Sequence, residues 1–133
     1  IGANEYLVAG SDLIRAGDFD DGIRLTLIGL ERSNLGARDR AAGLGNLCAA
    51  YVSKNEPDAA LPHCDRSLAL DDLNWRVYTA RARAYYLKRM FAEAKRDNEA
   101  AAVINPGSAH VKELRGKINE QVLRPAVILE DHH

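Results

Sequence analysis

The chain has 133 residues, 47% of them apolar, which is enough to bury one hydrophobic core. Its 18 Lys and Arg nearly balance its 19 Asp and Glu, so the net charge does not indicate a nucleic-acid or membrane partner. No apolar run approaches the roughly 20 residues that span a bilayer. Two cysteines are too few for a disulfide scaffold and lack the spacing of a zinc site. We therefore expect a soluble single-domain protein without membrane insertion.

Apolar and small residues recur at three- and four-residue steps, as in Leu44, Leu47, Cys48 and Tyr51, which is the periodicity of a helix. Breaks in this pattern carry glycine, proline or a capping residue and fall at Gly17, Asn55 to Pro57, Asn74, and Pro106 to Gly107. The pattern predicts about seven helices and no strand in the body of the domain, near residues 3–16, 19–33, 38–54, 57–70, 75–88, 91–104 and 108–122.

The end of the chain is expected to differ from its body. Pro125 should stop the last helix near Val122, so we expect residues 123–133 to be extended or disordered, folded back on the domain, or added to a partner. Pro62 lies about one turn inside a predicted helix and should kink that helix or delay its start. Because the chain begins at Ile1 and not at methionine, we expect an upstream segment to be missing, and the compartment, cytoplasmic or periplasmic, stays open.

An internal repeat organises the whole chain. Residues 46–72 align without gaps on residues 80–106, with an offset of 34 residues, and a weaker upstream copy aligns with an offset of 38. The alignment places Tyr51 on Tyr85 and Ala60 on Ala94. Each copy contains two predicted helices, so the sequence predicts units near residues 3–40, 41–74 and 75–108. Residues 109–122 then form a terminal helix that shields the last unit from water.

The repeat resembles the tetratricopeptide repeat family, whose 34-residue unit places large, small and aromatic residues at fixed positions. The second and third units carry this pattern in Leu44, Leu47, Cys48, Tyr51, Ala60 and Ser67, and in Tyr78, Ala82, Tyr85, Ala94, Ala101 and Pro106. The resemblance implies an all-α, right-handed superhelical stack of three antiparallel helix pairs with a capping helix. The sequence departs from the family pattern at Asp72, which replaces a closing proline, and at Asn98, which replaces an aromatic.

The stretch GDFDDG, from Gly17 to Gly22, looks by itself like a metal-binding loop. A calcium loop needs glycine at the sixth place and glutamate at the twelfth, whereas counting from Asp18 puts glycine fifth and Gly29 twelfth. The equivalent stretches of the other units, NEPDAAL and RMFAEAK, could not hold a metal ion. We therefore predict a hairpin turn whose aspartates lie at the positive end of the next helix.

No catalytic site, cofactor or metal ion is indicated. The four histidines are scattered, at His63, His110, His132 and His133. A thiol and base pair of Cys48 with His63 is less favoured than simple packing of a small buried cysteine. Asp131 and the last two histidines could collect a metal ion, although a disordered or vector-derived tail is the preferred interpretation.

Two structural pairings follow from placing the helices antiparallel. Cys48 should lie opposite Cys64, where they could form a disulfide in an oxidising compartment or stay reduced and pack in the cytosol. Arg81 occupies an inward position in its unit and should need a partner, for which Asp97 on the facing helix is the candidate. A structural ion pair is preferred there over a contact with a ligand.

The resemblance also implies a binding surface, because in this family the first helices of successive units line a concave groove. The groove residues would be Asn4, Leu7, Ser11, Asn46, Ala49, Arg76, Thr79, Arg83 and Tyr86. The last four share one helix stripe that could hold a carboxylate or an acidic peptide, although a plain solvated face is the alternative. Some family members clamp the C-terminal carboxylate of chaperones. Only Asn46 and Arg76 match that set here, whereas Leu7, Ser11 and Ala80 do not, which disfavours such a role.

The sequence therefore favours a non-catalytic scaffold that binds an extended or helical segment of another protein. Two alternatives stay open. One is assembly, in which the uncapped first helix stacks on a second copy or on a further domain. The other is nucleic-acid binding through the basic third unit, since residues 75–117 hold 10 Lys and Arg against 4 Asp and Glu. The first 74 residues, with 7 against 12, would repel phosphate, so no nucleic-acid partner is expected.

Overall fold

The computed structural model describes residues 2–32 and 34–131, and over these residues the chain is all-helical without strands. Its helices are α1 (Ala3–Arg15), α2 (Phe19–Leu30), α3 (Ala37–Ser53), α4 (Pro57–Leu70), α5 (Trp75–Leu87), α6 (Phe91–Ile104) and α7 (Ala109–Asp131). The predicted all-helical class is confirmed, and α1 to α6 begin and end within a few residues of the predicted bounds.

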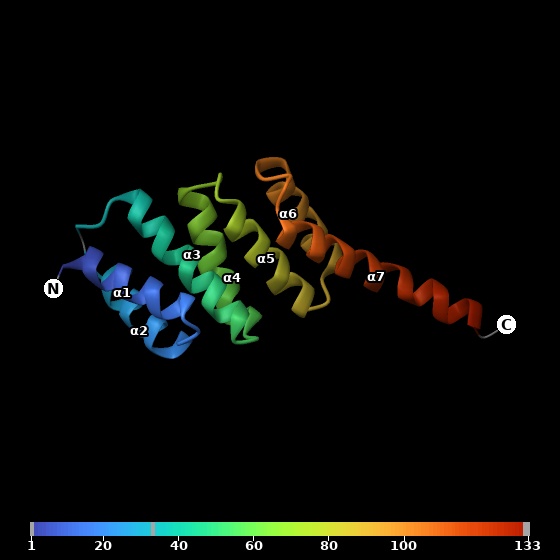
Figure 1. Cartoon of the computed structure of the whole chain (residues 1–133), viewed down its shortest axis with the longest axis horizontal. Coiled ribbons are helices and arrows are strands. Elements are labelled where there is room, and N and C mark those ends of the chain that lie inside the picture. The colour runs from blue at the N-terminus through green and yellow to red at the C-terminus, as the bar shows by residue number, and fades with distance from the viewer. Residues whose placement is uncertain (1, 33, 132–133) are drawn as a thin grey trace.

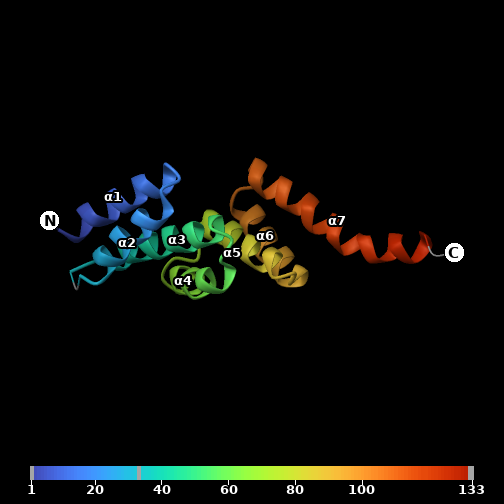
Figure 2. The same cartoon turned by 90° about the horizontal axis from the view of Figure 1, so that it is seen from below.

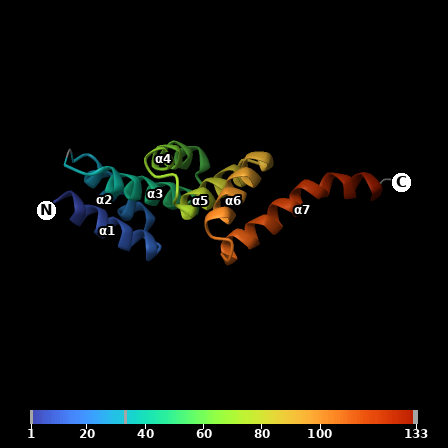
Figure 3. The same ribbon diagram turned by 90° about the horizontal axis from the view of Figure 1, so that it is seen from above.

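The helices form pairs that follow one another along the long axis of the molecule (Figure 1). α1 packs on α2, α3 on α4 and α5 on α6, and the first helix of each pair also contacts the first helix of the next. α7 covers the third pair and then projects beyond it, so the two ends of the chain lie far apart (Figures 2 and 3). The first helices α1, α3, α5 and α7 therefore lie in succession along the stack.

The turn inside each pair has the same geometry in all three units. Gly17, Asn55 and Arg89 occupy equivalent positions and have φ values of 89°, 60° and 61°. The backbone N–H of the following residue closes each turn with a hydrogen bond of 2.9 Å to a carbonyl oxygen of the first helix, donated by Asp18 to Leu13, by Glu56 to Tyr51 and by Met90 to Tyr85. This is the left-handed end of an α-helix. GDFDDG is thus the first of three equivalent hairpin turns.

Small residues lie where the helices of a pair approach most closely. A Cβ atom at Gly22 would lie 3.0 Å from the carbonyl oxygen of Gly10, so a larger residue would push α1 and α2 apart. Ala60 and Ala94 occupy the equivalent positions of the second and third units and are fully buried. The repeat pattern read from the sequence is therefore a packing pattern.

The first half of α7 closes the hydrophobic core of the third unit. Val111, Leu114 and Ile118 are buried, and the last two pack against Ala94 on α6. Asn98, at the position where an aromatic is usual, is buried and donates a side-chain N–H to the carbonyl oxygen of Val111 at 2.9 Å. The amide therefore ties α6 to the start of α7 with a hydrogen bond in place of ring packing.

α7 is longer than predicted. It continues through Pro125 to Asp131, so the prediction of a helix that stops at Val122 and an extended segment over 123–131 is wrong. Proline removes one backbone N–H at a cost of about 3 kcal/mol, but its fixed φ is itself helical and a helix can pass through it. For the same reason α4 begins at Pro57, with Pro62 inside it, and does not start late.

Ion pairs between neighbouring units also recur at equivalent positions. Lys54, at the end of α3, lies 2.5 Å from Asp20 at the start of α2, and Lys88, at the end of α5, lies 2.6 Å from Asp58 at the start of α4. Arg81 and Asp65 pair at 3.0 Å. Their equivalents 34 residues later, Arg115 and Glu99, pair at 2.8 Å. These contacts hold each unit in the same position relative to the one before it. They thereby position the helices that line the groove.

Candidate functional site

A groove runs along the first helices of the stack. Four adjoining pockets form it, and neighbouring pockets share lining residues. Asn46 lines both of the pockets that lie between α1 and α3. Arg76 lines one of these two and also the pocket between α3 and α5. Arg83 lines the pocket between α3 and α5 and also the pocket beside α7. The lining therefore passes continuously from α1 to α7.

The middle of the groove has an apolar floor with aromatic and basic walls. Ala49 and Val52 of α3 and Ala80 of α5 supply the floor. The walls of this pocket are Trp75, Arg76, Arg83 and His110. A surface of this kind can bury an apolar side chain and hold an anionic group beside it.

Arg76 and Arg83 carry the positive charge that is available in the groove. Both are exposed, and within residues 2–32 and 34–131 no carboxylate forms an ion pair with either. The guanidinium of Arg76 lies over the Trp75 ring, 5.3 Å from its centroid, which restricts its rotamers. The other arginine and lysine side chains that line the groove are paired, Arg15 with Asp12 at 3.0 Å and Lys117 with Glu113 at 3.2 Å.

Comparison with known proteins gives a match at the level of structure. No protein-family model matches the chain, and no curated protein matches it. The first tetratricopeptide domain of Spaghetti (RPAP3), bound to the HSP90 peptide SRMEEVD, has a TM-score of 0.79 at 22% identity, over 90% of this chain and 92% of that chain. The tetratricopeptide domain of P58(IPK) has a TM-score of 0.84 at 22% identity, over 92% of this chain and 34% of that chain.

A third structure, the second tetratricopeptide domain of human RPAP3 in complex with the HSP70 peptide SGPTIEEVD, has a TM-score of 0.75 at 21% identity, over 89% of this chain and 98% of that chain. The chain has the tetratricopeptide repeat fold. At these identities the likeness establishes the fold alone, so the use of the tetratricopeptide groove has to be argued from its own residues.

All nine residues expected from the sequence to line the tetratricopeptide groove do line it. They are Asn4, Leu7, Ser11, Asn46, Ala49, Arg76, Thr79, Arg83 and Tyr86. Thr79 contributes differently from expectation, because only 5% of it is exposed and its hydroxyl donates to the carbonyl oxygen of Trp75 at 3.1 Å. It therefore forms part of the floor, and its hydroxyl is already engaged.

Sequence reasoning missed the contribution of α7 to the tetratricopeptide groove. His110 lines the middle pocket, and Glu113 and Lys117 line the pocket at the end. His110 and Lys117 lie 34 residues after Arg76 and Arg83, so they are the next members of the same stripe. Extending the repeat alignment into the capping helix would have found them, but that helix was interpreted as a cover only.

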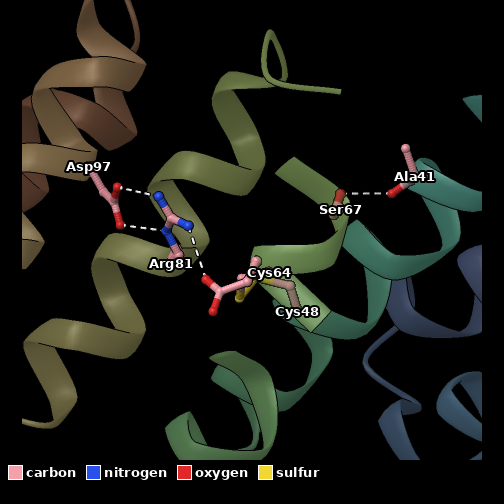
Figure 4. The surroundings of a disulfide bond; sticks show 7 residues. Ala41, Cys48, Cys64, Ser67, Arg81 and Asp97 are labelled. Atoms are coloured by element: carbon pink, nitrogen blue, oxygen red, sulfur yellow. Dashed lines mark hydrogen bonds and ion pairs between the residues drawn. A yellow bond between two sulfur atoms is a disulfide. The ribbon is translucent and has the colours of Figure 1, made fainter. Parts of the chain in front are cut away.

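The residues of the two predicted pairings line none of the groove pockets. Each pairing joins two helices of one unit (Figure 4). Cys48 on α3 and Cys64 on α4 are joined by a disulfide with a Cα–Cα distance of 4.9 Å, and both are fully buried. Beside it, Ser67 donates its hydroxyl to the carbonyl oxygen of Ala41 at 2.8 Å. The second unit is thus fastened by a covalent bond and a buried hydrogen bond.

Arg81 joins three helices through its guanidinium (Figure 4). It makes two hydrogen bonds of 2.8 Å to the carboxylate of Asp97 on α6 and one of 3.0 Å to Asp65 on α4. The hydrogen bond to Asp97 raises the pKa of Arg81 above its ordinary value, against the opposing effect of burial. Two carboxylates therefore neutralise the arginine, which serves the packing of the units.

The acidic turn shows no metal-binding geometry. Across the part of the chain that the structure describes, no three His, Cys, Asp or Glu side chains are grouped so as to hold a metal ion. In the turn, Asp20 pairs with Lys54 and Asp21 with Arg24. His132 and His133, considered above as metal scavengers, lie outside the described residues. None of the described helices is long and apolar enough to cross a membrane.

Proposed function

We propose that this domain is a non-catalytic interaction module whose groove binds a carboxylate-bearing segment of another protein. The observation that carries the proposal is the pair of exposed arginines, Arg76 and Arg83, which border an apolar pocket and have no carboxylate partner among the described residues. Two domains of the same fold hold acidic peptides, SRMEEVD and SGPTIEEVD, which supports a peptide as the class of ligand.

The composition of the groove supports a peptide more than a small metabolite. The pockets open along four helices in succession, and each has both apolar and polar lining, which suits a series of side chains from one peptide. A chaperone C-terminus is not the proposed ligand, because Leu7, Ser11 and Ala80 replace polar or basic members of the carboxylate clamp. The basic pair here is Arg76 with Arg83, on one helix.

Selection of a displayed library of random peptides on the purified chain tests this function. We expect the enriched peptides to contain Asp or Glu beside apolar residues, and Arg83→Glu to weaken their binding by about tenfold or more, because it replaces a favourable charge contact by a repulsive one. The same substitution should reduce the dependence of binding on salt.

Arg96→Glu is the matched control, since Arg96 is exposed on α6, lines none of the groove pockets and gives the same change in net charge. It should leave binding unchanged. An equal loss of binding affinity in both variants would mean that only the overall charge of the chain matters. Selection that enriches no peptide would contradict a peptide-binding role.

A further inference from the structure

Arg76 and Arg83 are placed as the two ends of a single recognition unit. They are seven residues apart on α5, so they lie on the same face with about 10 Å between them along the helix axis. Both line the middle pocket, and each also lines the next pocket along the groove, Arg76 on the side of α1 and Arg83 on the side of α7. One arginine therefore stands at each boundary of the middle pocket.

The floor between the two arginines is apolar. Ala80 is 8% exposed, Ala49 and Val52 are half-buried, and the buried Thr79 already donates its hydroxyl proton to the carbonyl oxygen of Trp75. A polar ligand group at this floor would find few partners and would lose its hydration. The pocket thus accepts an apolar side chain in the middle and a negative group at either end.

An extended chain supplies this arrangement at a fixed spacing. Residues i, i+2 and i+4 of an extended segment point to one side, and at about 3.3 Å per residue the outer two are roughly 13 Å apart. Arginine side chains that diverge from the pocket can span the small difference from the axial spacing. We infer that the middle pocket reads an extended segment in which three alternate residues are acidic, apolar and acidic.

This inference rests on the proposed function and adds a sequence pattern to it. Two unpaired guanidinium groups call for two carboxylates, whereas a chain terminus provides one. At least one of the two is therefore a side chain, and in the acidic, apolar, acidic pattern both are, so the segment can lie inside the partner's sequence. Binding should not require a free C-terminal carboxylate, in contrast to the clamp that some domains of this fold use.

Two synthetic peptides of identical composition, both acetylated and amidated at their ends, test the pattern. One contains Glu-Thr-Val-Thr-Glu and the other Glu-Glu-Thr-Thr-Val, within the same flanking residues. Titration calorimetry with the intact chain should show the first binding at least about tenfold more tightly than the second. Equal affinities, or no binding of the first peptide, would overturn the inference.

Substitution of each arginine assigns the contacts. In the first peptide, replacing one Glu by Gln should weaken binding to the wild-type chain severalfold. The same replacement should not weaken binding further in the variant, Arg76→Gln or Arg83→Gln, that lacks the arginine which pairs with that Glu. Additive losses in every combination would contradict direct pairing. If library peptides depend on Arg83 but ignore this spacing, the pattern fails and the proposed function stands; if no peptide binds in the groove, both fail.

Discussion

Asp65 and Asp97 contact the same guanidinium of Arg81 but in different surroundings. Asp97 is buried, with 7% of its side chain exposed, and accepts two hydrogen bonds from Arg81. The side chain of Asp65 is 57% exposed and makes one contact with the same guanidinium. A buried charge that loses its partner keeps its desolvation cost, while an exposed pair is weakened by solvent. The two aspartates should therefore contribute very differently to stability.

We predict that Asp97→Ala lowers the free energy of unfolding by about 3 kcal/mol, because it leaves the half-buried Arg81 with one exposed partner. Asp65→Ala, the matched control, should cost less than about 1 kcal/mol. Urea denaturation of both variants measures the difference. Peptide affinity should stay unchanged in each, and similar stability losses would refute a special role for the buried pair.

His63 makes stability depend on pH. Its ring stacks on Tyr51 with centroids 5.6 Å apart, its Nδ1 has no hydrogen-bond partner among the described groups, and burial lowers its pKa from the ordinary value of 6.5. The unfolded chain therefore binds a proton more readily than the folded chain as the pH falls through 6.5. The contribution of His63 to the free energy of unfolding is therefore fully present above pH 6.5 and is lost as the pH falls below it.

The wild-type chain should accordingly lose stability between about pH 7.5 and pH 5.5, and His63→Gln should lose less over the same interval. Thermal unfolding followed by circular dichroism at both pH values provides the comparison. An unchanged pH dependence in the variant would assign the effect to other groups.

At the scale of the elements, the repeat alignment carries most of the prediction. Helix bounds, the three hairpin turns and the groove residues on α1, α3 and α5 all follow from it, because spacing determines which residues share a helix face. It could not supply the low exposure of Thr79 or the hydrogen bond of its hydroxyl to Trp75, because both depend on local packing. It also left open whether Cys48 and Cys64 are close enough to join, since the distance between two helices depends on the packing of all their side chains.

The end of α7 shows a different limit. A proline rule predicts where a helix tends to stop, but the lost backbone hydrogen bond and the clash of the proline ring cost only about 3 kcal/mol, which does not forbid a helix from continuing. The rule therefore failed at Pro125, which lies inside α7, and the late start that it allowed for α4 is not seen. The groove residues of α7 were missed for another reason, because a capping role was assumed to exclude a lining role.

The disulfide between α3 and α4 closes a loop with a sequence separation of 16 residues. A loop of this length restricts the unfolded chain and stabilises the fold by about 3 kcal/mol. Reductant should therefore lower the unfolding temperature of the wild-type chain, whereas the Cys48→Ala/Cys64→Ala variant should not respond. Intact mass without reductant should show no free thiol after alkylation. Two alkylated cysteines in the oxidised protein would contradict the bond.

At the scale of the whole molecule, the two ends of the stack are unlike. The outer face of α1 presents Glu5 and Asp12, which are exposed, whereas the residues at the same repeat positions of α5 are the buried Val77 and Ala84. Stacking a second copy on α1 would bury these two carboxylates at a substantial desolvation cost. Assembly through α1 therefore stays a prediction that would have to offset this cost, whereas the groove is most basic near α5.

Perturbation of backbone amide resonances tests the central claim most directly, because it locates a ligand on the intact domain without any substitution. The blocked peptide containing Glu-Thr-Val-Thr-Glu should shift the amides of residues 76–83 on α5, with Ala49 and Val52 on α3 and His110 on α7. The amides of α2, α4 and α6 on the other side of the stack should change little. Shifts concentrated on those second helices, or no shifts at saturating peptide, would contradict a groove that binds acidic segments through Arg76 and Arg83.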